Sequence, residues 1–230
     1  MKKIIKIATR KSPLAVKQAE IVSQIILNHH DNIDVNLIPM ISSGDQMDSK
    51  SFKSNGGKGL FLKELEDALL RKDVDMAVHS MKDVPAKLLK KFSILSIMDR
   101  GNPRDVFLSN KFKSLDKMPE GSIVGTSSPR RVALIKSIYK KLTTKDLRGN
   151  IETRINKLNT GEVDAIILAA AGLTRLSLKS KIKQELPLNI FIPSAGQGTL
   201  CVEFLKKNES IKQILLNCVN KDVEICTNAE

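Results

Sequence analysis

The hydrophobic positions of this chain fall into short apolar runs that alternate with amphipathic stretches, which is the pattern of an α/β protein. Runs rich in Ile, Val and Leu predict strands at 4–8, 35–41, 76–78, 93–98, 106–108, 122–125, 165–168 and 200–204, and a strand that ends at 147–150. Apolar residues at helical spacing predict helices at 13–26, 61–71, 129–139, 150–159 and 208–219, with the start of another at 226–230.

The order of these elements repeats once along the chain. Ser12 and Ser128 each stand between a strand and a helix, and each is followed by proline. Serine is a good N-cap and proline suits the first helical position, so both junctions start a helix whose free N–H groups favour an anion. A helix, an acidic turn and a strand then recur in the same order, at 61–78 and at 150–168. The repeat predicts two similar α/β domains that face each other across a cleft.

Two turn-rich segments, 99–105 and 191–198, interrupt the apolar pattern and predict hinges between the domains. The expected domains are 1–98 together with 199–219, then 104–192, and finally 220–230 as the start of a third domain.

Residues 42–59 contain four glycines and no apolar periodicity. A loop of this length in a compact domain is usually functional or disordered. We interpret it as a mobile flap over a site, with Lys58 on it; a disordered insertion explains the composition equally well.

The net charge of +13 is compatible with a nucleic-acid binder, but its distribution is not that of a broad basic face. The Lys residues are scattered, whereas eight of the nine Arg residues lie in or beside the turn-rich segments. Aromatic residues make up only 3% of the chain, so platforms for base stacking are few. Because arginine presents a planar fork to carboxylates, we expect a cleft for a small polyanion and no nucleic acid.

The rest of the composition argues against further classes of protein. No apolar run approaches the ~18 residues that a membrane-spanning helix needs, so no membrane partner is expected. The three cysteines are odd in number and lack metal-ligand spacing, which predicts a reducing, cytoplasmic compartment and no metal site. Nothing in the sequence requires more than a monomer.

The first candidate site follows the predicted strand at 76–78. Ser80, Lys82 and Asp83 crowd its carboxyl end, and ligands of open α/β sheets bind at strand ends. A solvated Lys–Asp pair is the ordinary alternative for two such residues alone. In the second half of the sequence, four arginines lie at or near the two predicted helix starts: Arg130, Arg131, Arg148 and Arg154. Each alone fits a surface ion pair, but their clustering favours carboxylate binding.

Seven segments resemble the porphobilinogen deaminase (hydroxymethylbilane synthase) family: IATRKSPLA, GGKGLFLKELE, AVHSMKDVP, GTSSPRR, LRGNIETR, DAIILAAAGLTRL and PSAGQG. They occur in the family's order and cover nearly the whole chain from residue 7. The resemblance implies two α/β domains like those of periplasmic binding proteins, and a third α+β domain that this chain lacks. It also implies a transferase of tetrapyrrole (haem) synthesis that joins four porphobilinogen molecules head to tail, releases ammonia and uses a dipyrromethane cofactor as primer.

Carried over by motif position, the resemblance implies that Asp83 is the catalytic carboxylate. It places contacts to acetate and propionate groups on Arg10, Ser12, Lys82, Ser128, Arg130, Arg131, Arg148 and Arg154. Lys58 and Phe61 match the flap and its base, Ser80 belongs to the same strand-end motif as Asp83, and further cleft positions are Thr126, Ser127, Gly172 and Gln197.

The family tethers its primer to a cysteine in the third domain, beyond a stretch that resembles 227–230. Cys201, Cys218 and Cys226 do not match that position, and we expect all three to be buried or inert. The resemblance therefore leaves activity of the chain as written open.

The reaction that the resemblance implies agrees with the chemistry of the candidate residues. Loss of ammonia from an aminomethylpyrrole needs a proton donor and develops positive charge, which a carboxylate such as Asp83 can supply and stabilise. The alternatives are a catalytically impaired form or a non-catalytic two-lobed binder of small polycarboxylates, and, from the net charge, a nucleic-acid binder.

Overall fold

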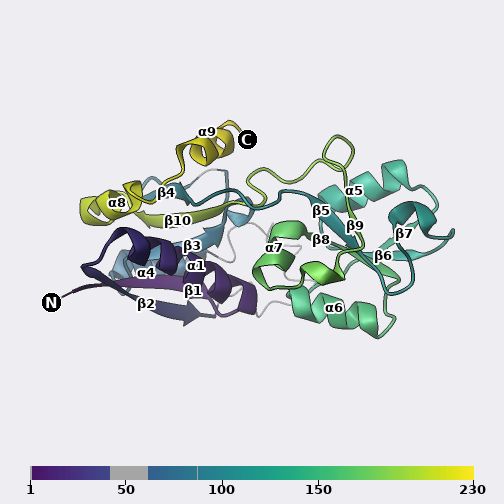
Figure 1. Ribbon diagram of the computed structural model, residues 1–230, viewed down its shortest axis with the longest axis horizontal. Coiled ribbons are helices and arrows are strands. Elements are labelled where there is room, and N and C mark those ends of the chain that lie inside the picture. The colour runs from purple at the N-terminus through teal and green to yellow at the C-terminus, as the bar shows by residue number, and fades with distance from the viewer. Residues whose placement is uncertain (1, 42–61, 87) are drawn as a thin grey trace. The chain divides into compact units, whose positions relative to one another are not determined.

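The computed structural model describes residues 2–41, 62–86 and 88–230. The chain forms two compact units (Figure 1). The first unit contains Met1–Arg100 and Thr199–Glu230, and the second contains Gly101–Gly198. The predicted flap at 42–59, with Lys58, and the predicted flap base Phe61 lie outside the described residues.

The first unit has a five-stranded mixed sheet of order β2-β1-β3-β10-β4. Its strands are β1 (Lys3–Arg10), β2 (Ile33–Met40), β3 (Met76–Ser80), β4 (Phe92–Ile97) and β10 (Leu200–Leu205). β1 runs parallel to β2 and β3, whereas β10 runs antiparallel to β3 and β4. β10 therefore returns to the first sheet, between β3 and β4, as the sequence predicts for the first domain.

Helices cover both faces of this sheet. Among the described residues these helices are α1 (Pro13–His29), α4 (Lys63–Arg71), α8 (Glu209–Leu216) and α9 (Lys221–Ala229). α1 and α8 bury Val22, Ile26 and Leu215 in a core with Ile5 and Ile7, while α4 packs on the opposite face against Ala8 and Ala77. α9 packs along β4, and Arg100 forms an ion pair with Glu230 just after that helix. The assignment of 220–230 to a third domain stays a prediction.

The second unit repeats this plan in a sheet of order β7-β6-β8-β5-β9. Its strands are β5 (Asp105–Leu108), β6 (Ile123–Gly125), β7 (Thr143–Lys145), β8 (Ala165–Ala169) and β9 (Gln184–Glu185). Its helices are α5 (Pro129–Ile138), α6 (Ile151–Asn159) and α7 (Ala170–Arg175), with 3-10 turns at Leu115–Lys117 and Lys179–Lys181. β6 is parallel to β7 and β8, and β5 is antiparallel to β8 and β9. The prediction of two α/β domains is confirmed.

One predicted strand end is wrong. Residues 147–150 do not end a strand, because β7 stops at Lys145. Gly149 adopts a φ of +111°, which is incompatible with an extended strand, and the side chain of Asn150 caps α6. The segment is a loop that carries Arg148 to the start of α6.

Candidate anion-binding and catalytic site

Asp83 lies on a 3-10 turn (Met81–Asp83) that follows β3 directly. Met81 N donates a hydrogen bond to Thr199 O at 3.0 Å, and Ser80 Oγ accepts one from Gln18 Nε2 at 2.9 Å. Gln18 is buried on α1, so both the neighbouring strand segment and a helix hold the turn. Asp83 itself is exposed, which leaves its carboxylate accessible to a ligand.

The β1–α1 junction lies at the same edge of the first sheet. β1 and β3 are parallel, with Ala8 opposite Ala77, so their carboxyl ends lie side by side. Arg10 is the last residue of β1 and is half-buried. Ser12 Oγ accepts a hydrogen bond from Ala15 N at 3.4 Å and so acts as the N-cap of α1.

In the second unit the matching junction connects β6 to α5. Ser128 Oγ caps α5 by accepting from Arg131 N at 3.4 Å, and Thr126 Oγ1 accepts from Ser128 N at 3.2 Å. Thr126 is buried and Ser127 is half-buried. The two predicted serines therefore hold helix N-termini in the structure, which points backbone N–H groups at the sheet edge.

Arg148 and Arg154 flank the start of α6. Asn150 Oδ1 accepts from Thr153 N at 2.8 Å and begins the helix, with Arg154 in its first turn. Arg148 Nε donates to Asp146 Oδ2 at 3.3 Å. Since β6 and β7 are parallel, the loop after β7 lies at the same edge of the sheet as the β6–α5 junction.

Arg130 and Arg131 both contact Asp105, the first residue of β5. Arg131 Nη2 donates to Asp105 Oδ1 at 2.7 Å, and Arg130 Nη2 lies 2.7 Å from Asp105 Oδ2. Gln197 Nε2 donates to the same Oδ1 at 2.9 Å. Burial alone raises the pKa of Asp105, but the two guanidinium groups and the amide outweigh it and hold the pKa below its usual range.

This network has two guanidinium groups for one carboxylate. Arg131 is buried, and its Nη1 also donates to Ile167 O at 2.8 Å. The side chain of Arg130 is 24% exposed, so it is the member of the pair that solvent or a ligand reaches. Because Asp105 neutralises only one of the two guanidinium charges, the remaining positive charge can bind an additional carboxylate.

Two other predicted positions in the second unit are buried. Gly172 lies in α7, close to the carboxyl end of β8. Gln197 also donates to Pro103 O at 2.6 Å. This hydrogen bond joins the segment that enters the second unit to the segment that leaves it. Close by, Arg175 Nη2 donates to Gly198 O at 2.6 Å, and burial lowers the pKa of Arg175 to about 10.

The predicted site residues that the structure describes are divided between the two units. The first unit holds Arg10, Ser12, Ser80, Lys82 and Asp83; the second holds Thr126, Ser127, Ser128, Arg130, Arg131, Arg148, Arg154, Gly172 and Gln197. An arrangement of the arginines around Asp83 stays a prediction.

Sequence reasoning missed Asp105 and Gln18. An acidic residue directly before the apolar run of β5 was a usable signal for Asp105, because a charge that enters a buried strand needs a partner. Gln18 has no comparable signal, since a single glutamine in an amphipathic helix is ordinary.

The three cysteines differ in exposure. Cys201 is fully buried on β10, where burial raises the pKa of its thiol and the Glu203 and Asp83 carboxylates raise it further. Burial also raises the pKa of Cys218. Cys226 is exposed, because α9 turns only Val223 into the core, and the expectation that this cysteine is inert stays a prediction.

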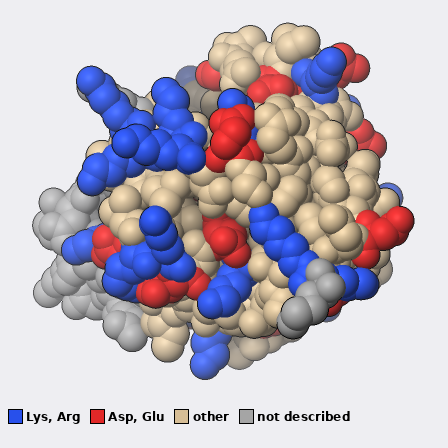
Figure 2. Space-filling view, turned by 90° about the vertical axis from the view of Figure 1, so that its left-hand side faces the viewer, with Lys and Arg blue, Asp and Glu red and all other residues tan. Residues whose placement is uncertain are grey.

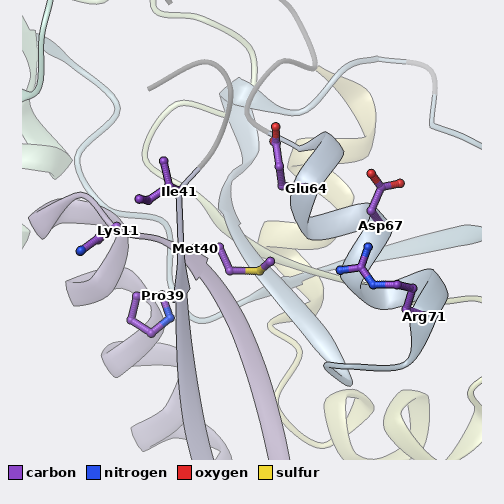
Figure 3. Close-up of a pocket in the computed structure, with 7 residues that line it drawn as sticks. All are labelled: Lys11, Pro39, Met40, Ile41, Glu64, Asp67 and Arg71. Carbon is purple, nitrogen blue, oxygen red and sulfur yellow. The ribbon is translucent and has the colours of Figure 1, made fainter. Parts of the chain in front are cut away.

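A cavity of about 480 Å³ opens at the end of β2 in the first unit (Figure 3). It is lined by Lys11, Pro39, Met40, Ile41, Glu64, Asp67 and Arg71. Its charged groups include both signs, and of the predicted site residues that the structure describes, none lines it.

Figure 2 shows Lys and Arg side chains in separate groups, with Asp and Glu side chains among them.

Within the described ranges, no helix is long and apolar enough to cross a membrane, and no group of three or more His, Cys, Asp or Glu residues is placed to hold a metal ion.

The family model for the porphobilinogen deaminase, dipyromethane cofactor binding domain, matches residues 5–213. The chain belongs to the porphobilinogen deaminase family. It is 46% identical over 228 residues to the porphobilinogen deaminase of Legionella pneumophila (strain Lens), covering 99% of this chain and 74% of that protein. The porphobilinogen deaminase of Buchnera aphidicola subsp. Acyrthosiphon pisum (strain APS) is also 46% identical, over 230 residues, with 99% and 73% covered.

Solved structures share the fold of this porphobilinogen deaminase family member at low identity. The methionine binding protein MetQ aligns with a TM-score of 0.56 at 14% identity, covering 98% of this chain and 94% of that one. A periplasmic substrate-binding protein of an ABC transporter from Coxiella burnetii aligns with a TM-score of 0.57 at 15% identity, covering 98% and 96%. These likenesses confirm the predicted periplasmic-binding-protein architecture and concern the fold alone.

Proposed function

We propose that this chain catalyses the stepwise condensation of four porphobilinogen molecules, with release of ammonia, and the release of the product by water as hydroxymethylbilane, in tetrapyrrole synthesis. Family membership supports the pathway. The observation that carries the specific proposal is the exposed carboxylate of Asp83 on an anchored turn, within a chain that also holds an arginine network with positive charge in excess.

Each condensation breaks the C–N bond of one aminomethyl group and forms a C–C bond from its methylene carbon to a pyrrole α-carbon. The departing amine takes up a proton and leaves as ammonia, and the attacked α-carbon loses a proton. We assign both proton movements to the Asp83 carboxylate, which also offsets the positive charge that develops on the ring system.

The arginines bind the acid side chains. Porphobilinogen carries two carboxylates, so a growing chain accumulates negative charge that needs several donors. We assign this role to Arg10, Arg130, Arg148 and Arg154, and to the N-termini of α1 and α5, which Ser12 and Ser128 cap. Arg131 contributes charge from its buried position beside Asp105.

The residues present fit a dipyrromethane cofactor, because its acid groups match the excess positive charge of the Arg130–Arg131 network. When bound, the cofactor supplies the pyrrole to which the first substrate is added. Cys201, Cys218 and Cys226 are not assigned as its tether. Cytoplasmic location, a monomeric state and the absence of nucleic-acid and membrane partners remain predictions.

The test is incubation of the purified chain with porphobilinogen, followed by measurement of ammonia and of uroporphyrin after oxidation. Asp83→Asn is expected to abolish product while the thermal unfolding curve stays unchanged. Asp73→Asn is a matched control, since Asp73 is an exposed acid of the same unit that contacts Arg71. An Asp83→Asn protein that keeps most of its turnover refutes the assignment of this residue.

The alternative is a non-catalytic binder of small polycarboxylates. In that case the wild-type chain binds porphobilinogen in calorimetry but releases no ammonia. Intact-mass measurement of the purified chain, followed by peptide mapping of any adduct, is the accompanying check, because a dipyrromethane-sized adduct on one of the three cysteines identifies that cysteine as a tether.

A further inference from the structure

We propose that Asp105 is a positioning residue of the anion site: its carboxylate orients the guanidinium groups of Arg130 and Arg131 and connects them to the segment that carries Gln197. The inference rests on the proposed function for the identity of the anion. The orientation itself is a property of the ligand-free chain and is tested separately below.

The Asp105 carboxylate has three partners, which come from two other parts of the second unit. Arg130 and Arg131 come from the first turn of α5, and Gln197 comes from the segment after Phe191 that leads out of the unit. Asp105 is fully buried. A buried carboxylate is costly unless it is paired and hydrogen-bonded, so its contacts with these three side chains are what make its position tolerable.

Each guanidinium group is also fixed from a second side. Arg131 Nη1 donates to Ile167 O at 2.8 Å, on the strand next to β5. Arg130 Nη1 donates to Ile192 O at 2.6 Å, and Arg130 Nε lies 3.3 Å from Ser194 Oγ. Two or more fixed acceptors define the plane of a guanidinium group, so both arginines are oriented before any ligand binds.

Orientation before binding has a consequence for affinity. A long, flexible arginine loses side-chain entropy when it binds a carboxylate, and that loss is smaller if the side chain is already held. Arg130 is the partly exposed member of the pair, and Asp105 neutralises only one of the two positive charges. Asp105 thus prepares Arg130 to accept an anion while leaving the positive charge that attracts it.

The orientation is tested without substrate by arginine-selective modification with p-hydroxyphenylglyoxal, with the modified positions identified by peptide mass spectrometry. Asp105→Asn is expected to raise the modification rate of Arg130 and Arg131 several-fold. Arg148 serves as an internal reference, since one of its partners is Asp146 and it is not among the charges that shift the pKa of Asp105. Equal rates at Arg130 and Arg131 in the two proteins overturn the inference.

The effect on the anion site is tested by calorimetric binding of porphobilinogen. Asp105→Asn is expected to weaken binding about tenfold or more, in line with the loss of one partner of a buried charged network. Asp164→Asn is the matched control: Asp164 accepts from Ile123 N and Lys111 in the same unit, and its replacement is expected to leave affinity within twofold. Unchanged affinity in a folded Asp105→Asn protein overturns the proposal.

If Asp105→Asn does not fold, Gln197→Leu replaces it, because this change removes one partner of Asp105 and keeps both arginine contacts. It is expected to raise the modification rate of Arg131 and to weaken porphobilinogen binding several-fold, and no change in either measurement refutes the role. If the wild-type chain binds porphobilinogen without turnover, the proposed function fails while both readouts for Asp105 still apply.

Discussion

His79 and Glu203 form a buried pair in the first unit, with His79 Nε2 3.1 Å from Glu203 Oε2. The two residues lie on the neighbouring antiparallel strands β3 and β10, on the face that α4 covers. Glu66, on α4, interacts with both of them. His79 directly precedes Ser80, so this pair holds β10 against the strand that leads to Asp83.

Glu203→Gln is expected to lower the free energy of unfolding by about 1 to 3 kcal/mol, because the change disturbs a buried hydrogen bond and leaves polar atoms without matched partners. Urea denaturation measures the loss. Glu209→Gln, at an exposed position on α8, is the control and is expected to have little effect. Equal stability of the Glu203→Gln and Glu209→Gln proteins contradicts a structural role for the pair.

Glu66 makes the stability depend on pH in a defined direction. Burial and the adjacent Glu203 carboxylate raise the pKa of Glu66, so the folded state holds a proton there more tightly than the unfolded chain does. The contribution of protonated Glu66 to stability is fully present below the pKa that this residue has in the unfolded chain. It is lost as the pH rises through the raised pKa of the folded state. Glu66→Gln keeps a neutral side chain at all pH values.

The Glu66→Gln protein is therefore expected to gain stability relative to the wild type as pH rises from about 4 toward neutrality. Thermal unfolding across this range measures the difference between the two proteins. A difference that is independent of pH, or that grows as pH falls, contradicts the raised pKa.

Asp105 makes the stability depend on pH in the opposite direction. Its pKa is lowered in the folded state, so its contribution to stability is present above the unfolded pKa and is lost as pH falls through the folded value. The stability gap between wild type and Asp105→Asn is expected to be widest near neutral pH and to narrow below about pH 4. Chemical denaturation at several pH values checks this, and a gap that widens in acid rules it out.

Gly149 and Gly161 form a matched pair in the second unit. Both have positive φ, but a Cβ on Gly149 would lie 2.6 Å from Thr153 Cγ2, while one on Gly161 would have nothing within 4 Å. Gly161→Ala is expected to cost about 1 to 2 kcal/mol from backbone strain alone. Gly149→Ala is expected to cost about 1 to 3 kcal/mol more because of the added crowding.

Urea denaturation of the two glycine variants gives the comparison directly. Gly149 also separates Arg148 from the Asn150 cap, so Gly149→Ala is expected to displace Arg148 as well. If the two variants are equally stable, the close approach of Thr153 does not limit this loop.

Much of the fold could be predicted from the sequence because its signals are local. Ser12 and Ser128 before proline mark two helix starts, and both caps are formed between atoms three residues apart. The apolar runs of β3, β8 and β10 predict buried strands without knowledge of their neighbours. The predicted strand end at 147–150 failed because a positive φ at Gly149 is a property of the turn and leaves no periodic trace.

The site depended on the tertiary structure where its partners are far apart in the chain. Asp105 meets Arg131 from 26 residues away and Gln197 from 92, and His79 meets Glu203 from 124. Sequence patterns report which residues are apolar and where helices begin, since those depend on near neighbours. Only the tertiary structure decides which buried charges meet, and here the contact of α5 with β5 placed Asp105 beside two arginines that the sequence alone had assigned directly to a ligand.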